Sequence, residues 1–358
     1  MNQDDFHKLI SGKKAGFGAI LLRFVLGAAS AGYSIAVQFR NFLYSAGLLK
    51  AHRTEAAVIS IGNITTGGTG KTPLVVWLCK QIISDSQCAI LTRGYKSRTQ
   101  ETEYLTDEPA IFAESCPEVK VIVNPDRVAG AEEAAIKFGT KVLILDDGFQ
   151  HRRLARDLDI VAIDATLPFG YGRILPAGLL REPVSSLKRA GAVVITRCDQ
   201  IAENELRGLE KKLQLINPDM VIARSIHAPA EVKSIDNKEI SLEGLKGKKI
   251  FAFCGIGNPG SFLSTIKTAG AGLAGSKIFN DHHHYTEDCI TDIFEQAERL
   301  KADLILTTQK DQNKIPRPAL TKKEIPLAYM GIEIKFLSGE EKLWGLIEKT
   351  LAGKMPKM

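Results

Sequence analysis

The sequence predicts an α/β protein in which parallel strands alternate with covering helices. Short apolar runs rich in Val, Ile and Leu recur along the 358 residues, and segments with helical periodicity separate most of them. A glycine-rich stretch, residues 62–73, joins one such run to a helical pattern. A longer apolar segment near the N-terminus lies outside this alternation. We therefore expect two α/β domains preceded by a helix of a different kind.

Length and composition exclude several classes of protein. Hydrophobic residues make up 44% and charged residues 25% of the chain, which excludes a disordered chain, a collagen-like fibre and a multi-span membrane protein. At about 100–200 residues per domain, the length predicts two domains. The 47 Lys and Arg against 41 Asp and Glu give a net charge of +6, which indicates anionic partners.

The first 53 residues carry most of this charge, with seven basic and two acidic side chains. From Ala15 to Val37 they are mostly apolar, and the uncharged part, Phe24–Phe39, is shorter than the roughly 20 residues of a spanning helix. Basic residues on both sides favour membrane attachment of residues 1–50, as a short span or as a helix in the interface. A buried core helix is the alternative.

Six cysteines have no CxxC motif and no metal-ligand spacing. In a chain of this length they indicate reduced thiols and therefore the cytosol. This location argues against a signal peptide, which the basic start and Ala29-Ser30-Ala31 would otherwise allow.

The first predicted strand, Ala56–Ile61, leads into a phosphate-binding loop. The template G-x-x-x-x-G-K-[ST] fits at Gly70, Lys71 and Thr72, whereas Thr65 replaces the first glycine. Loop N–H groups at a helix N-terminus cradle phosphate, the lysine reaches the β- and γ-phosphates, and the threonine hydroxyl ligates Mg²⁺. The cofactors expected are therefore ATP and Mg²⁺, and the alternative is a strand–helix turn without nucleotide. The residues expected to bind nucleotide are Thr66, Gly67, Gly68, Thr69, Gly70, Lys71 and Thr72.

Two acidic residues, Asp146 and Asp147, end the apolar run that starts at Val142. Such a pattern is typical of a Walker B strand, whose carboxylates emerge at the sheet edge that carries the phosphate loop. We therefore expect both to be metal ligands. On its own, the pair would better suit the start of a turn, and it is the phosphate loop upstream that favours metal coordination.

Other apolar runs extend the α/β pattern through both halves of the chain. A polar stretch near residues 215–248 predicts the boundary, so a P-loop NTPase-like α/β/α domain is expected at 51–225 and a smaller α/β/α C-terminal domain at 226–358. Helices are expected at 127–138 and 290–300. The remaining strands are expected at 89–92, 119–123, 160–163, 192–196, 250–254 and 304–307.

Seven motifs follow one another along the chain. They are Gly62–Pro73, Leu91–Tyr95, Thr106–Pro109, Asp146–His151, Gly172–Pro183, Gly255–Pro259 and Asp281–Tyr285. In this order they resemble the tetraacyldisaccharide 4'-kinases, the lipid A 4'-kinases, and the resemblance runs from the N-terminal apolar helix to Thr307–Asp311. Lys96 departs from the family's usual glycine, and His284 adds a third histidine to the usual pair.

The resemblance implies an ATP- and Mg²⁺-dependent transfer of the γ-phosphate to the 4'-hydroxyl of a tetraacyl glucosamine disaccharide 1-phosphate, which forms a lipid A precursor. It also implies two α/β/α domains with the active site between them and an N-terminal membrane helix. The expected location is the cytoplasmic face of the bacterial inner membrane. The expected partners are the glycolipid and the membrane surface, with no nucleic acid and no obligate protein partner.

The resemblance also implies roles for individual residues. Lys71 would act on the transferred phosphate, Asp107 would be the catalytic base, and His282 would orient that base, with His283 as the close alternative. A carboxylate near the attacking hydroxyl can take its proton late in the step. A metal site that includes Asp281, or a solvated histidine loop, are the other interpretations of this histidine cluster. The candidate substrate contacts are Asn63, Arg93, Arg173, Arg181 and Glu182, with Arg173 and Arg181 preferred.

Two other functions remain open from the residues alone. The first is a GTPase or ATPase, because Thr308–Asp311 resembles a guanine-reading motif after a strand. The second is a membrane-tethered nucleotide-binding scaffold without transfer activity.

Overall fold

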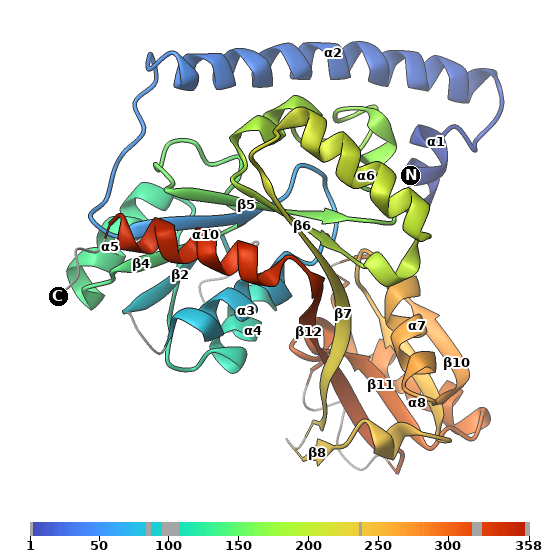
Figure 1. Ribbon diagram of the computed structural model, residues 1–358. Helices are drawn as coiled ribbons and strands as arrows, with labels where there is room; N and C mark the ends of the chain where they lie inside the picture. Colours follow the sequence, from blue (N-terminus) through green and yellow to red (C-terminus); the bar gives the residue numbers. More distant parts are fainter. Residues whose placement is uncertain are drawn as a thin grey trace. The chain divides into compact units, whose positions relative to one another are not determined.

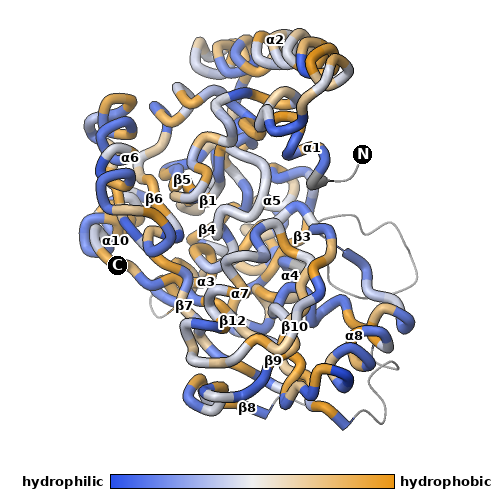
Figure 2. Tube along the Cα trace, turned by 90° about the vertical axis from the view of Figure 1, so that its right-hand side faces the viewer, coloured by the Kyte–Doolittle hydropathy of each residue, from blue (hydrophilic) through white to orange (hydrophobic). Residues whose placement is uncertain are grey.

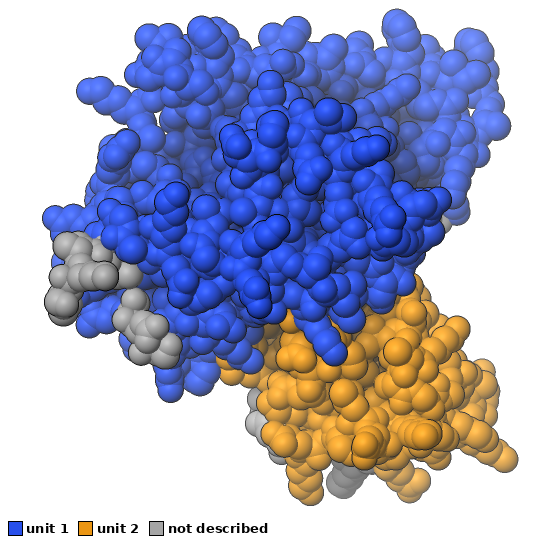
Figure 3. All heavy atoms as spheres, in the orientation of Figure 1, with its two compact units in different colours: residues 1–94, 116–226, 335–358 blue, residues 95–115, 227–334 orange. Residues whose placement is uncertain are grey.

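The computed structural model describes residues 3–83, 87–94, 107–235, 238–281, 283–316 and 324–354, with side chains except at residues 3, 4 and 107. The chain divides into two compact units, coloured separately in Figure 3. Unit 1 comprises Met1–Gly94, Cys116–Ile226 and Lys335–Met358, and unit 2 comprises Tyr95–Ser115 and His227–Ile334. The sequence-based division instead assigned residues 95–115 to the kinase domain and 335–358 to the C-terminal domain.

Unit 1 is built on a parallel sheet with the order β7-β6-β5-β1-β4-β2-β3 (Figure 1). Its strands are β1 (Ala57–Gly62), β2 (Cys88–Thr92), β3 (Lys120–Val123), β4 (Val142–Asp146), β5 (Leu158–Asp164), β6 (Ala192–Thr196) and the start of β7 (Val221–Ser234). Its α-helices are α1 (Gln3–Ile10), α2 (Phe17–Ser45), α3 (Lys71–Ile82), α5 (Arg127–Phe138), α6 (Glu203–Ile216) and α10 (Glu340–Ala352). Its 3₁₀ helices are η1 (Gly170–Gly172), η2 (Val184–Arg189) and η3 (Cys198–Gln200).

The strands of unit 1 are apolar because helices bury them. The central strands β1, β4 and β6 are buried at every position. Val58 and Leu143 pack with Val128 and Ala131 of α5, and α3 packs on β1 and β4. A parallel strand that is covered on both faces has a continuous hydrophobic sequence, which is why β1, β4 and β6 could be predicted from the sequence.

Unit 2 has its own parallel sheet, with strands in the order β10-β9-β11-β12. Its strands are β9 (Lys249–Cys254), β10 (Gly272–Ile278), β11 (Leu304–Thr308), most of β12 (Leu327–Ser338), the end of β7 and the short β8 (Glu239–Ile240), antiparallel to β7. Its helices are α4 (Asp107–Ser115), α7 (Pro259–Thr268), α8 (Glu287–Arg299), α9 (Gln309–Gln312) and the 3₁₀ helix η4 (Glu243–Leu245).

Side-chain alternation along β9 produces two hydrophobic cores in unit 2. Ile250 and Ala252 pack in a cluster with Phe262 of α7, whereas Phe251 packs in a second cluster with Phe294 of α8. Successive strand residues point to opposite faces, so the sheet carries one helix layer on each side. This α/β/α arrangement, like that of unit 1, agrees with the predicted fold class.

All eight predicted strands are present, but the sequence did not predict β7, β8, β10 and β12. β7 runs through the polar stretch expected to separate the two domains, and it includes His227 and Pro229. Mixed burial along this strand removes the hydrophobic run by which a buried strand is recognised. Both β7 and β12 contribute residues to each unit.

The long helix α2 lies at the edge of unit 1, outside the layers that cover the sheet (Figure 1). Hydrophobic residues run along much of its length (Figure 2). Only Ala19 and Val37 of this helix are buried. By length and composition α2 could cross a membrane, and only 11% of its most apolar window is buried.

Candidate active site

The strands of unit 1 bring their carboxyl ends to one edge of the sheet. In the parallel register, Ile61 of β1 is opposite Asp146 of β4, and Asp164 of β5 is opposite Thr196 of β6. The loop that follows β1 therefore lies at the same edge as these polar residues. Ligands of open α/β sheets bind at this edge.

The phosphate loop, residues 63–70, connects β1 to α3. Gly67 and Gly70 have φ angles of +106° and +86°, where a side chain would be strained, so the backbone of the loop requires glycine. Fully buried Asn63 donates from Nδ2 to Oγ1 of Thr69 at 3.0 Å. Asn63 thus ties the two ends of the loop together, and its role as a substrate contact stays a prediction.

Residues at the carboxyl ends of β5 and β6 hold the outer part of this loop. Thr196 donates its hydroxyl to the backbone oxygen of Thr69 at 2.9 Å, and Arg197 donates to the backbone oxygen of Gly68 at 2.8 Å. Burial lowers the pKa of Arg197, and its ion pair with Asp164 opposes this effect. The sequence analysis missed Arg197 and Asp164. A polar residue directly after a buried strand, the signal used for Asp146, could have found both.

Lys71, Asp147 and Arg181 form an ion-paired cluster beside the loop. The Nζ of Lys71, the first residue of α3, is 3.4 Å from Oδ1 of Asp147, and a guanidinium nitrogen of Arg181 is 2.7 Å from Oδ2. Arg181 is held there because its backbone N–H donates to the oxygen of Ile64 at 2.7 Å. The structure therefore brings together three of the residues predicted from the sequence.

The two cations determine the charge of Asp147. Burial raises the pKa of its carboxyl, but Lys71 and Arg181 together outweigh burial and hold the pKa well below its usual range. Asp147 is therefore a carboxylate at every physiological pH.

Asp146 lies at the end of β4, and its Oδ2 accepts a hydrogen bond from the Thr92 hydroxyl at 3.0 Å. Thr72 occupies the first turn of α3, next to Lys71. Hydroxyl and carboxylate oxygens are the hard donors that Mg²⁺ prefers, so Thr72, Asp146 and Asp147 fit this ion by donor chemistry.

Two residues near this cluster were not singled out from the sequence. Burial lowers the pKa of Arg127 to about 10, against the opposing effect of Asp146 and Asp147, and the guanidinium stays charged. Burial, followed by the charge of Arg127, lowers the pKa of His151 to about 4, so its imidazole is neutral at pH 7. Both residues line a pocket of about 390 Å³.

The remaining substrate candidates differ in their surroundings. Glu182 is fully buried, and its carboxylate accepts hydrogen bonds from Asn41 of α2 at 2.8 Å and from Arg189 at 3.0 Å. Glu182 thus fastens α2 to unit 1. Arg93 and Arg173 are exposed, so their side chains are accessible to a ligand.

In unit 2, three motifs meet at the carboxyl ends of the strands. Gly255, which follows β9, donates its N–H to Oδ2 of Asp311 at 2.9 Å. A Cβ at Gly255 would lie 3.1 Å from the Cβ of His283, so glycine permits the two loops to approach closely. The fully buried carboxylate of Asp311 also accepts the Thr308 hydroxyl at 2.7 Å and pairs with Lys314. This carboxylate is already engaged, which disfavours the guanine-reading interpretation.

Asp107 is the first residue of α4, which belongs to unit 2. Within unit 2, Glu114 of α4 accepts hydrogen bonds from Gln309 at 2.8 Å and from Tyr329 at 2.7 Å. The side chain of Asp107 and all of His282 lie outside what the structure describes. No group of three His, Cys, Asp or Glu side chains in the described ranges could hold a metal ion.

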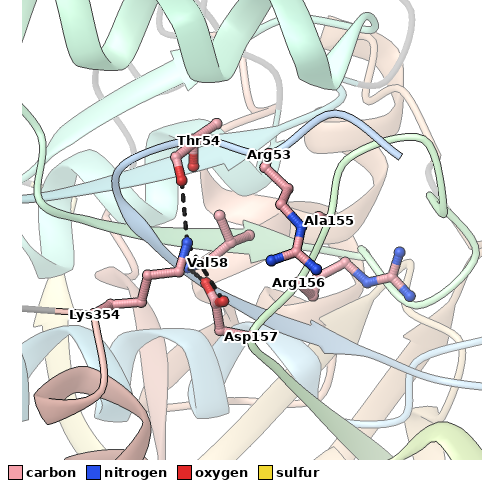
Figure 4. A pocket seen from close by; sticks show the side chains of 7 residues that line it. All are labelled: Arg53, Thr54, Val58, Ala155, Arg156, Asp157 and Lys354. Atoms are coloured by element: carbon pink, nitrogen blue, oxygen red, sulfur yellow. Dashed lines mark hydrogen bonds and ion pairs between the residues drawn. The ribbon is translucent and has the colours of Figure 1, made fainter. Parts of the chain in front are cut away.

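A smaller pocket in unit 1, of about 60 Å³, lies at the amino end of β1, away from the phosphate loop (Figure 4). It is lined in part by Val58, near the amino end of that strand, and by Lys354. The ammonium of Lys354 donates to the backbone oxygen of Thr54 at 3.1 Å and pairs with Asp157 at 3.5 Å. Its position separates this pocket from the phosphate loop.

The fold and the site define a nucleotide-binding protein of the P-loop class, with the loop after β1 and the acidic end of β4 at one sheet edge. The chain belongs to the LpxK family, tetraacyldisaccharide-1-P 4'-kinase, whose model matches residues 22–352. It is therefore a lipid A-type glycolipid kinase by family.

Individual relatives agree with this assignment. The chain is 38% identical to a tetraacyldisaccharide 4'-kinase of Halothermothrix orenii over 92% of this chain and 93% of that protein. It is 36% identical to one from an Anaeromyxobacter species, over 87% of each. It matches the crystal structure of an "apo" form of LpxK from Aquifex aeolicus in complex with ATP, with a TM-score of 0.69, 30% identity and coverage of 92% and 99%.

Proposed function

We propose that this protein transfers the γ-phosphate of ATP to the 4'-hydroxyl of a tetraacyl disaccharide 1-phosphate. The observation that carries the proposal is the cluster of Lys71, Asp147 and Arg181 beside the phosphate loop. Phosphoryl transfer depends on positioning and on neutralising charge, and this cluster offers two cations and a carboxylate at one place. ATP binding by the Aquifex aeolicus relative supports the choice of nucleotide.

Before nucleotide binds, Asp147 pairs with both Lys71 and Arg181, and one positive charge stays unbalanced for a phosphate. We expect the triphosphate to compete for Lys71, which lies 12% exposed at the start of α3. Thr72, Asp146 and Asp147 would hold Mg²⁺, which neutralises charge on the transferred phosphate. Arg181 would remain at the loop because backbone hydrogen bonding to Ile64 fixes it there.

The proton acceptor is assigned to unit 2. Asp107, at the start of α4, would take the proton of the 4'-hydroxyl, and His282 or His283 would orient its carboxylate. The close approach of Gly255 to His283 supports a fixed position for this histidine, because Gly255 is itself held by its hydrogen bond to Asp311. In this proposal unit 1 binds the nucleotide and unit 2 supplies the base.

We infer that α2 lies in the membrane interface on the cytoplasmic side. The outward face is apolar, with Phe24, Ile35 and Phe39 each at least 60% exposed. From the other face, Ser30 donates to the backbone oxygen of Ile174 at 2.8 Å, and Asn41 binds Glu182. A helix that packs against unit 1 along this half cannot also be surrounded by lipid, so an interfacial position fits better than a full span.

The same contacts link α2 to the phosphate loop. Tyr33 donates to the backbone oxygen of Arg181 at 3.3 Å, and Thr66 of the loop donates its N–H to Leu179 at 2.8 Å. The segment that ends at Arg181 therefore connects the membrane-binding helix to the nucleotide site, as a kinase with a membrane-bound substrate requires.

Incubation of the purified protein with ATP, Mg²⁺ and a tetraacyl disaccharide 1-phosphate, followed by mass spectrometry, tests the function. The expected product is heavier by one phosphate, placed at the 4' position by fragmentation. Nucleotide hydrolysis without this product would support the scaffold or NTPase alternatives instead.

Asp107→Asn tests the base. We expect turnover to fall by about 10²–10⁴-fold, because the proton acceptor is lost, while ATP affinity stays near that of the wild type. Steady-state kinetics and a nucleotide-binding titration measure the two quantities separately. The control is Glu108→Gln, which removes a charge at the next position. Equal losses of turnover and of ATP affinity in Asp107→Asn would place this residue in nucleotide binding.

A further inference from the structure

A cysteine and a histidine contact each other in unit 2. Cys289 lies in the first turn of α8, where Thr286 caps the helix by accepting its backbone N–H at 3.2 Å. Its Sγ is 3.8 Å from Nε2 of His283, within hydrogen-bonding distance for sulfur. Cys289 is partly exposed, so a small reagent can reach this pair.

His283 is held in place and is suited to accept a proton. Its ring stacks on Phe279, with centroids 4.3 Å apart and an interplanar angle of 22°, and Tyr285 packs against it edge-on at 4.9 Å. Burial lowers the pKa of His283, and the charges of His284, Lys314 and Lys277 act in the same direction, whereas Asp311 opposes them. The imidazole is therefore neutral at pH 7, and in the tautomer protonated at Nδ1 its Nε2 can accept the thiol proton.

The surroundings of Cys289 favour the thiolate. A hydrogen bond from the Thr286 hydroxyl lowers the pKa of the thiol, and Lys277 adds to this effect, against burial and the charge of Asp288. The first turn of α8 contributes a partial positive charge. Thiolates at helix N-termini beside a base are the reactive form of cysteine in proteins.

The other cysteines differ from Cys289. Burial raises the pKa of Cys198 to about 11 and that of Cys254 to about 12, and Cys79 and Cys116 are also buried. Cys88 is partly exposed, but its thiol faces the backbone oxygen of Ala89. Cys88 is therefore a matched internal control for exposure without an imidazole contact.

We propose that Cys289 and His283 form a reactive thiol site that takes hydroperoxides and other soft electrophiles. Nε2 of His283 accepts the thiol proton, and the sulfur attacks a peroxide oxygen. The S–O bond forms as the O–O bond breaks, and the leaving oxygen takes the proton from His283. The products are the sulfenic acid of Cys289 and water or an alcohol; the sulfur loses two electrons and the peroxide gains them.

This chemistry has a consequence for the kinase, which rests on the proposed function. An oxygen atom on Sγ enters the space between the sulfur and Nε2, so the stacked ring of His283 must shift or be held by the new group. His283 belongs to the loop that would orient the base. We therefore expect oxidation of Cys289 to lower turnover reversibly.

The test labels the full-length protein in detergent micelles with limiting N-ethylmaleimide at neutral pH, and peptide mass spectrometry follows each cysteine. Cys289 should react at least about tenfold faster than Cys88. His283→Gln and His283→Asn should bring the Cys289 rate near that of Cys88, and Cys88→Ser should leave it unchanged. Hydrogen peroxide followed by dimedone should mark Cys289.

Equal labelling of Cys88 and Cys289 in the wild type would overturn the proposal, and so would an unchanged Cys289 rate in a His283 variant that melts like the wild type.

Peroxide should lower turnover of the wild type but not of Cys289→Ser, and a thiol reductant should restore it. If peroxide lowered the turnover of the wild type and of Cys289→Ser equally, the link between oxidation of Cys289 and turnover would be overturned. Labelling needs no substrate, so a protein without glycolipid kinase activity would overturn only the proposed function.

Discussion

The ionised side chains beside the phosphate loop form one connected network of ion pairs. Asp147 contacts both Lys71 and Arg181, and neither cation is more than about a third exposed. Breaking such a partly buried network leaves a charge without its partner, which costs more than the pair itself contributes. Single substitutions in this network should therefore change ATP affinity and turnover to different extents.

Asp147→Asn keeps the shape of the side chain and removes its charge. We expect turnover to fall by at least about 10²-fold because a Mg²⁺ ligand is lost, whereas affinity for ATP without metal rises because Lys71 no longer has a competing carboxylate. A titration in chelator and a Mg²⁺-dependent assay measure the two effects. The control is Asp126→Asn, an exposed cap of α5 where Asn also caps well. A parallel fall in both quantities would contradict this role for Asp147.

His151 makes stability depend on pH. Its folded pKa of about 4 lies below the ordinary value of 6.5, so the unfolded chain binds more protons between these values. The protein should therefore lose on the order of 1–3 kcal/mol of stability as pH falls from about 6.5 to about 4, and His151→Gln should lose less over this window. Denaturant titrations at several pH values measure the difference. Identical pH profiles for the two proteins would contradict it.

At the level of elements, α2 has an unusual distribution of polarity. Its polar side chains Ser30, Arg40 and Asn41 bind unit 1. Most of its large apolar side chains, such as Phe24 and Phe39, are exposed instead. A soluble amphipathic helix has the reverse arrangement. Fully buried Glu182, which binds Arg40, Asn41 and Arg189, fixes this orientation.

A triple variant of the outward face, Phe24→Ser, Ile35→Ser and Phe39→Ser, tests the membrane role. Burial of each such side chain contributes roughly 1.5–3 kcal/mol, so binding to anionic vesicles should fall by at least about 100-fold. Vesicle flotation measures this loss. The matched control substitutes Ser at other exposed apolar positions, Ile136, Leu215 and Leu337, and should bind like the wild type. Unchanged flotation of the α2 variant would exclude this face as the anchor.

On the scale of the whole molecule, the end of the chain completes unit 1. The chain returns through β12. Phe336 near the end of that strand and Trp344 of α10 pack against Trp77 of α3, and Trp77 donates to Glu340 at 3.1 Å. Helix α3 begins with Lys71 of the phosphate loop, so residues more than 250 positions away support the proposed nucleotide site.

Leu343→Ala tests this dependence. Leu343 is fully buried in α10, and its truncation should destabilise unit 1 by about 2–5 kcal/mol. Both tryptophans of the chain lie in unit 1, so their fluorescence during denaturant unfolding reports on this unit. Leu215→Ala, at a position that is 84% exposed, is the control and should unfold like the wild type. Equal midpoints for the two variants would show that α10 does not stabilise unit 1.

The sequence by itself determined the features that are local. The strand, glycine loop and Lys71 are contiguous, Asp146 follows its apolar run directly, and the α2 segment shows its hydropathy in one stretch. Such signals depend on neighbours along the chain, which is why the phosphate loop, eight of the strands and the family resemblance were predictable.

Only the tertiary structure decided which distant segments share a core or a charge. It placed α4 in unit 2 and α10 in unit 1, and it turned Glu182 towards α2. Strand β10 was not predicted from the sequence because glycines interrupt its apolar run. The tertiary packing requires them, as at Gly275, where a Cβ would lie 2.6 Å from Leu300. Contacts between residues far apart in sequence, such as Lys71 with Asp147, form only when the sheet brings strand ends together, so no local pattern encodes them.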